Sequence, residues 1–170
     1  MSPPPHISET LGVFVPGFTQ AMMALSVAEL EQRLKTSLEA GLVPAAAEQR
    51  RMCMQHLVPD ADDECVEQLP ELVRVRRANA EMLVGPAEVV PGDLVLLAPG
   101  DRAPADLRLV WAAGPVMAGS DFGGDETSRH PEAPAAFMVF AGEQVLDHEC
   151  HGLALAIGVN CAMFQPRRNK

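Results

Sequence analysis

Five consecutive residues in the second half of the sequence carry side chains that can bind a metal ion. They read Asp147-His148-Glu149-Cys150-His151. Imidazole, thiolate and carboxylate groups are ligands of zinc and copper, but consecutive residues of a strand alternate between its faces, so all five cannot converge on one ion. His148 and Cys150 could share a face and are the candidate ligands. We expect a polar hairpin tip ending at Gly152 and no bound metal; a metal-binding protein acting through residues 147–151 remains an alternative.

Other reactive patterns are missing from the sequence. It contains no Gly-x-Ser-x-Gly motif for a nucleophilic serine, and Gly123-Gly124 lacks the lysine and the helix of a phosphate-binding loop. The four cysteines form no Cys-x-x-Cys pair, which favours reduced thiols over a structural zinc site. We therefore expect no cofactor and no enzymatic activity.

The composition predicts a globular protein and argues against a nucleic acid partner and a membrane span. Hydrophobic residues make up 48% of the 170 residues and charged residues 21%, a balance that suits one domain with a real core. A net charge of -10 repels phosphate backbones, so we expect no nucleic acid partner. The sequence has no apolar stretch of the length that a membrane span requires, and the residues after Met1 do not form a signal peptide. We predict a cytoplasmic protein.

The elements that would position any site begin with a helical segment. Residues 1–24 are rich in proline and glycine and predict a flexible arm, and residues 25–58 predict two short helices. Ser26 and Glu29 form a capping box for the first helix, and Gly41 is expected to end it. Pro44 suits the first turn of the second helix.

The remainder of the sequence predicts strands. Residues 59–70 read as an acidic linker, residues 71–164 as short strands separated by Gly and Pro turns, and residues 165–170 as a basic tail. The fold class that we expect is α+β, with a helical pair followed by a compact, mostly antiparallel β domain.

Two turns in the β region carry the most specific pattern. The segment from Val89 to Leu109 contains Gly92-Asp93, Gly100-Asp101 and Pro104-Ala105-Asp106. Glycine permits the tight turns, aspartate can accept hydrogen bonds from turn amides, and proline fixes the backbone before the next strand. This segment resembles the core of the actuator domain of P-type cation-transporting ATPases.

The resemblance extends in both directions. Residues 25–30 and 36–42 are similar to the amino-terminal helical segment of cation pumps, and residues 137–142 and 152–158 to the closing strands. The order of these segments and the Ala-Asp-Leu-Arg sequence most resemble the sodium/potassium and proton/potassium pumps, and the calcium pumps are a near second. The resemblance implies the distorted jelly-roll fold of the actuator domain.

Two departures from the family decide the function that we expect. The family's Thr-Gly-Glu-Ser loop falls at Gly123-Gly124-Asp125-Glu126, where Asp125 replaces the glutamate that orients water for hydrolysis of an aspartyl phosphate. A carboxylate one methylene shorter is displaced by about 1 Å, an error that can cost about a hundredfold in rate. In addition, only the acidic linker stands where a pump has two membrane helices, and the sequence has no phosphorylation or nucleotide domain.

These departures predict a non-catalytic, pump-derived module with an interaction, regulatory or structural role. Its partner would be a protein, either a P-type ATPase α chain or a larger assembly. One alternative is a phosphatase-like actuator that acts in trans through Asp125 or Glu126; another is a truncated pump fragment.

Overall fold

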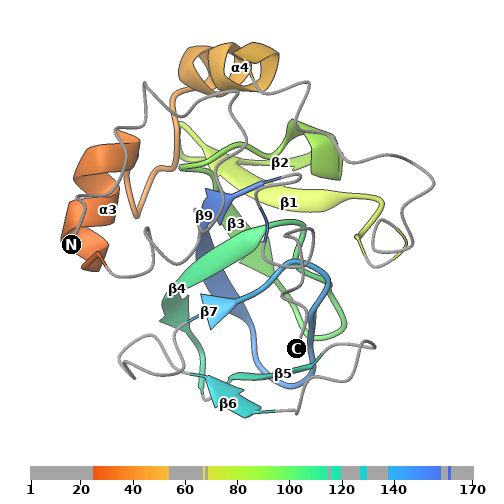
Figure 1. The fold of residues 1–170 in the computed structure, drawn as a ribbon. Helices are drawn as coiled ribbons and strands as arrows, with labels where there is room; N and C mark the ends of the chain where they lie inside the picture. Colours follow the sequence, from red (N-terminus) through yellow and green to blue (C-terminus); the bar gives the residue numbers. More distant parts are fainter. Residues whose placement is uncertain are drawn as a thin grey trace, which may run out of the picture.

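The computed structural model describes residues 25–53, 67, 69–114, 116–119, 127–129, 138–157 and 161, with the backbone alone for residues 127–129. The expected flexible arm (1–24), the basic tail (165–170), most of the acidic linker and the loop at residues 123–126 lie outside this range. Within it the chain forms two helices followed by antiparallel strands, which confirms the α+β class (Figure 1). No helix in these segments is long and apolar enough to cross a membrane.

A six-stranded antiparallel sheet forms the centre of the fold, in the order β2-β1-β3-β9-β4-β7. Its strands are β1 (Val73–Arg77), β2 (Ala80–Val84), β3 (Leu94–Leu97), β4 (Asp106–Ala112), β7 (Met138–Val139) and β9 (Cys150–Ala156). A short 3₁₀ helix, η3 (Pro86–Glu88), follows β2. The last strand, β9, lies between β3 and β4 and pairs with both.

A second sheet of three short strands lies at the end of the molecule opposite helix α4 (Figure 1). Its order is β6-β5-β8, with β5 (Val116–Gly119), β6 (Thr127–Arg129) and β8 (Gln144–Val145). Because β8 leads directly into β9, the chain passes from the small sheet to the centre of the large one at residues 146–149.

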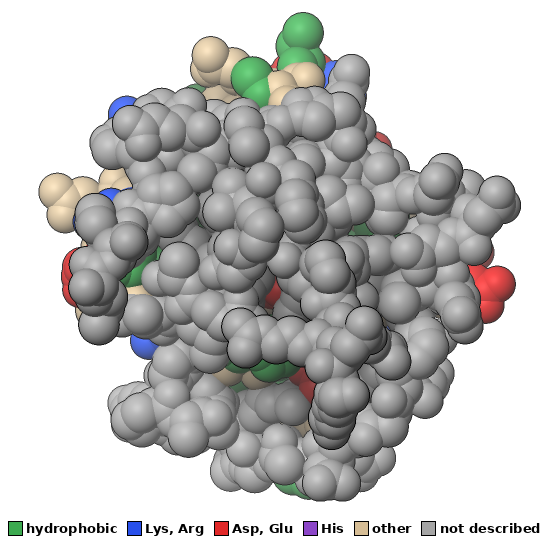
Figure 2. Space-filling model, viewed as in Figure 1, with side chains coloured by type: hydrophobic (Ala, Val, Ile, Leu, Met, Phe, Trp, Pro, Cys, Tyr) green, Lys and Arg blue, Asp and Glu red, His purple; other side chains and the backbone are tan. Residues whose placement is uncertain are grey.

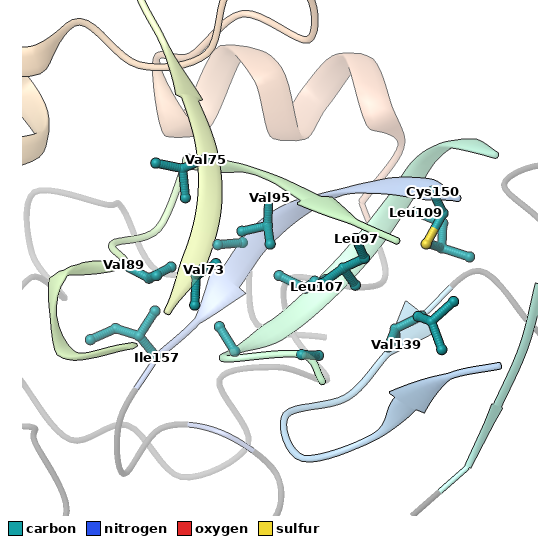
Figure 3. Packing of buried hydrophobic residues seen from close by; sticks show 14 of the residues in the cluster. Val73, Val75, Val89, Val95, Leu97, Leu107, Leu109, Val139, Cys150 and Ile157 are labelled. Carbon is teal, nitrogen blue, oxygen red and sulfur yellow. The ribbon is translucent and has the colours of Figure 1, made fainter. Parts of the chain in front are cut away.

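The main core lies on one face of the large sheet. Alternate residues of β1, β3 and β4, such as Val75, Val95 and Leu107, are fully buried and lie in one cluster on the same face of the sheet (Figure 3). Eleven of the buried positions in this cluster are Val or Leu, and none is aromatic. Valine, the commonest residue of this cluster, is β-branched and packs well on a pleated surface.

Helix α3 (Val27–Leu34) covers part of the opposite face. Leu30 and Leu34 are fully buried and pack with Leu153 and Leu155 of β9. The Ser26 hydroxyl accepts a hydrogen bond from the Glu29 backbone N–H (3.2 Å), and both halves of the capping box are present, as predicted.

Helix α4 (Pro44–Cys53) begins at its proline, as predicted, and presents hydrophobic side chains at the top of the view in Figure 2. Ala47 packs with Leu42 and Val90 in a small cluster of its own. Val43 and Met52 are exposed, each by more than 60%.

The prediction that Gly41 ends the first helix is wrong. The helix ends at Leu34, and Lys35 adopts the left-handed conformation as its C-cap (φ 51°). Gly41 serves a different contact, because a Cβ atom there would lie 1.7 Å from the carbonyl oxygen of Arg76. The close approach of this turn to β1 therefore requires glycine.

The expected hairpin at residues 147–151 is also different in the structure. Cys150, His151 and Gly152 are already part of β9, and the strand before them, β8, belongs to the other sheet. The segment is thus a crossover between sheets. Gly152 is needed for packing within β9, since a Cβ atom there would meet Leu107 at 2.7 Å.

Candidate functional site

The first Gly-Asp pair of the family core closes a turn on itself. The Asp93 backbone N–H donates to the Val90 carbonyl, and the Asp93 carboxylate accepts from the Val90 N–H, both at 3.0 Å. Gly92 supplies the positive φ (98°) that the turn requires. The aspartate therefore closes the turn with its side chain and its backbone.

The second pair repeats this geometry. The Asp101 N–H donates to the Ala98 carbonyl (3.0 Å), and its Oδ2 accepts from the Ala98 N–H (2.9 Å). Gly100 has a φ of 96°. Two turns eight residues apart in sequence thus share one hydrogen-bonding plan.

A third turn of this kind was not predicted from the sequence. Glu143 takes the place of aspartate: its N–H donates to the Phe140 carbonyl (3.0 Å), and its Oε1 accepts from the Phe140 N–H (2.7 Å). Gly142 again has a positive φ (87°). The signal was present, because Ala141-Gly142-Glu143 has the same layout as Pro91-Gly92-Asp93 with a longer carboxylate.

Backbone hydrogen bonds join the second and third turns. The Gly100 N–H donates to the Val145 carbonyl (2.7 Å), and the Val145 N–H returns a bond to the Asp101 carbonyl (2.9 Å). Ala103 exchanges backbone bonds with the third turn, accepting from Gly142 and donating to Glu143, both at 2.9 Å. The two turns therefore form one rigid corner.

The first turn is fixed by β1 instead. Arg77 donates from Nε to Asp93 Oδ1 (2.8 Å) and from Nη2 to Oδ2 (2.7 Å), and Asp93 is completely buried. These bonds raise the pKa of the Arg77 guanidinium above its usual value, although partial burial acts in the opposite direction. In the sequence Arg77 is the last arginine of Arg74-Val75-Arg76-Arg77, and no local pattern connects it with Asp93.

The helical segment holds the same turn from the other side. Arg50 donates to the carbonyls of Pro91 and Leu34, both at 2.6 Å, and the Thr36 hydroxyl donates to the Gly92 carbonyl (2.7 Å). Burial lowers the pKa of Arg50, and the nearby Asp93 carboxylate opposes this shift. One arginine thus ties the end of α3 to the Gly-Asp turn.

The Pro104-Ala105-Asp106 part of the core is buried. Asp106 begins β4, has no exposed surface, and accepts the Ala141 N–H at Oδ1 (3.0 Å). The register of β4 with β9 shifts directly after it. Its carboxylate therefore supports the start of the strand and the third turn.

The family-core carboxylates thus have one chemical role in common. The side chains of Asp93, Asp101 and Asp106 each accept a backbone N–H, and Asp93 and Asp106 are completely buried. Such carboxylates stabilise backbone geometry. The degenerate loop at residues 123–126 lies outside the described residues.

The candidate metal ligands His148 and Cys150 lie in different surroundings. Cys150 points into the main core, where burial raises the pKa of its thiol to about 12 (Figure 3). His148 is half-exposed, with Nδ1 3.2 Å from Asp147 Oδ2, and its ring lies over Gly114. Among the described residues no three His, Cys, Asp or Glu side chains are grouped so that they could hold a metal ion.

The chain matches a protein-family model over more than half of its length. The model of the P-type ATPase actuator domain matches residues 67–165. This range includes the three turns and both sheets, and it leaves out α3 and α4.

Two curated relatives are cation transporters by name. The "Probable cation-transporting ATPase F" of Mycobacterium tuberculosis (strain ATCC 25618 / H37Rv) is 33% identical over 105 residues, which cover 56% of this chain and 12% of that protein. The "Sodium/potassium-transporting ATPase subunit alpha-4" of Homo sapiens is 41% identical over 103 residues, which cover 56% and 10%. The chain thus spans about a tenth of the length of these relatives.

Among solved structures, a crystal structure of a zinc-transporting PIB-type ATPase in the E2.Pi state aligns with a TM-score of 0.49 and 17% identity. The alignment covers 93% of this chain and 25% of that one.

Proposed function

Because this chain belongs to the P-type ATPase actuator domain family, we propose that it is a non-catalytic, actuator-derived interaction module that docks on the cytoplasmic part of a cation pump. The role is regulatory or structural, and the module acts in the cytoplasm. The observation that carries the proposal is the use of the family-core carboxylates: Asp93, Asp101 and Asp106 all stabilise turns, so the core builds a rigid platform.

The sequence of the loop at residues 123–126 supports a non-catalytic role. It reads Gly-Gly-Asp-Glu where the family has Thr-Gly-Glu-Ser. The shorter carboxylate of Asp125 and the added freedom of Gly123 both work against holding a water molecule in line for attack.

The connection between helices and sheet supports a role outside the membrane. Residues 54–72 alone join α4 to β1, and a single membrane helix needs about 20 apolar residues. The two membrane helices of a pump do not fit in this connection. The helical segment is nonetheless fastened to the Gly-Asp turn through Arg50 and Thr36.

The partner that we propose follows from the relatives. Both curated relatives described above are named as cation-transporting ATPases. A module that keeps the platform of an actuator can occupy or support the position of the native actuator on such a pump. It would then change how fast the pump's phosphoenzyme turns over.

The test is a reconstitution with the human sodium/potassium pump that contains the alpha-4 subunit. We expect the purified chain to bind the pump and to change the decay rate of its phosphoenzyme. The double variant Asp125→Asn, Glu126→Gln should act like the unchanged chain.

Two results would contradict the proposal. Absence of binding would remove the pump as partner. Faster decay that the double variant abolishes would instead establish the trans-acting phosphatase alternative.

A further inference from the structure

A row of five side chains crosses the large sheet, one from each of five neighbouring strands. In spatial order they are Leu83, Arg74, Leu96, His151 and Trp111. Each is the direct cross-strand partner of the next. Directly opposed residues of antiparallel strands point to the same face, so the five side chains share one face of the sheet.

The row lies beside helix α3. Leu153 follows His151 by two residues on β9 and therefore points to the same face, where it packs with Leu30 and Leu34. The helix covers this part of the face. The row has exposed ends: Leu83 is 63% exposed, and Trp111, the single tryptophan of the sequence, is 45% exposed.

A break in register puts Trp111 on this face. In a regular strand Trp111 would point to the same side as Leu109, which is buried in the main core. The register of β4 against β9 shifts between these two residues, so Trp111 pairs with His151, and their ring centroids lie 4.6 Å apart. Bulges of this kind re-aim side chains in many proteins.

The Leu83 end of the row borders a hollow of about 130 Å³. Its walls combine apolar residues, Leu72, Leu83 and Leu96 among them, with three charged ones: Arg74, Asp101 and Arg102. Leu72 is 61% exposed. The leucines give the hollow an aliphatic part, which an apolar side chain of a partner can contact, and the charged residues give it a polar part.

Arg74 stands between these apolar residues without a partner in the described part of the chain. Arg76 contacts Glu81 (3.4 Å) and Arg77 is paired with Asp93, whereas Arg74 makes no hydrogen bond or ion pair with a described residue. A cation with no acidic partner among the described residues is notable in a chain with a net charge of -10. An acidic group of a partner would complement it.

We propose that this row, the β-face row, binds a segment of a partner protein that carries an acidic side chain between two apolar ones. The acidic group pairs with Arg74, one apolar group enters the hollow beside Leu83, and the other packs on Trp111. Tryptophan and arginine are the residues most enriched at energetic centres of interfaces. Four strand spacings of about 4.8 Å separate the ends of the row, a distance that about six extended residues span.

The inference rests on the interaction role proposed above, because it names a surface for that role. The test of the row uses peptides and no pump, so the pump-docking proposal and the surface proposal can fail separately. Failure to bind the pump, together with peptide binding at the row, would remove the pump and keep the surface.

The experiment begins with selection of peptides of about eight residues from a random library on the full chain. Peptides without tryptophan are then titrated against the chain while the fluorescence of Trp111 is followed. We expect an acidic position flanked by apolar ones in the selected peptides, and a blue shift of the emission on binding.

Point variants test whether the selected peptide binds at the row. Measured by isothermal titration calorimetry, Arg74→Glu should weaken binding by about tenfold or more, and Leu83→Glu and Trp111→Ser should also weaken it. A peptide with lysine at the acidic position should regain affinity for Arg74→Glu. Met52→Ser on α4, a position as exposed as Leu83, is the control and should bind like the unchanged chain.

Several results would overturn the proposal. These are a selection that yields no binder, a consensus without an acidic position, or binding that none of the row variants changes. Self-association in sedimentation that Leu83→Glu abolishes would assign the row to a second copy of the chain. If Arg74→Glu does not fold, two other measurements decide: Leu83→Glu should weaken binding, and the lysine-bearing peptide should bind the unchanged chain more weakly than the acidic peptide does.

Discussion

Arg77 and Asp93 form a two-bonded ion pair in which the carboxylate is completely buried and also closes the turn that leads into β3. Breaking a buried pair by removing one partner typically lowers the free energy of unfolding by about 3–5 kcal/mol. We expect a loss of this size for Asp93→Ala, measured by urea denaturation.

The control is the exposed pair of Arg51 and Glu48 on α4. Glu48→Ala should leave the urea midpoint unchanged, because surface ion pairs contribute little to stability. If Asp93→Ala costs no more than this control, the pair does not hold the turn.

Gly41 and Gly100 allow steric clash to be separated from backbone strain. Both have a positive φ, but a Cβ atom at Gly41 would lie 1.7 Å from the Arg76 carbonyl oxygen, whereas at Gly100 nothing lies within 4 Å. Gly100→Ala should cost about 1–2 kcal/mol from left-handed strain alone. Gly41→Ala should cost clearly more or prevent folding, as thermal unfolding followed by circular dichroism would show. Equal losses would contradict the close approach of this turn to β1.

His151 should make stability depend on pH. Burial lowers its pKa below the ordinary value of 6.5, with Arg76 as a second cause. The unfolded chain therefore binds the proton more readily, so stability is fully present above 6.5 and is lost as pH falls through the lower pKa of the folded state.

The measurement compares urea midpoints of the unchanged chain and of His151→Phe from about pH 7.5 down to about pH 5. The phenylalanine retains a ring beside Trp111 but does not titrate. We expect the unchanged chain to lose more stability than the variant over this range. Parallel loss in both proteins would assign the pH dependence to other groups.

Cysteine reactivity should differ sharply between Cys150 and Cys53. The buried Cys150 thiol has its pKa raised to about 12, so the reactive thiolate is almost absent at neutral pH, while Cys53 is exposed at the end of α4. Treatment with iodoacetamide at about pH 8 and peptide mass spectrometry should show Cys53 modified and Cys150 protected until the chain unfolds. Modification of Cys150 in the folded protein would contradict its place in the core.

Local features of the structure were predictable from the sequence. The capping box of Ser26 and Glu29, the start of α4 at Pro44 and the two Gly-Asp turns each depend on residues within a few positions of one another. Such signals have a direct physical meaning in the sequence, since a cap or a turn forms with its own neighbours.

Features that depend on distant residues were not predictable. Arg77 finds Asp93 only because the β1–β3 pairing brings them together, and Gly41 is constrained by the carbonyl of Arg76, which lies on a different element. The shift that re-aims Trp111 likewise arises from the pairing of β4 with β9. Glu143 was missed for another reason, since its local pattern matches the aspartate turns only if a longer carboxylate is allowed.

The central position of β9 has a consequence for how the chain folds during synthesis. β3 and β4 both pair with β9, and α3 packs against it, yet it is the last strand of the described chain to leave the ribosome. Synthesis adds about 5–20 residues per second. For several seconds, therefore, the buried leucines of α3 and the edges of β3 and β4 that pair with β9 have no partner strand. The nascent chain therefore exposes apolar surface until residues 150–156 emerge, which is the interval in which chaperone contact would matter most.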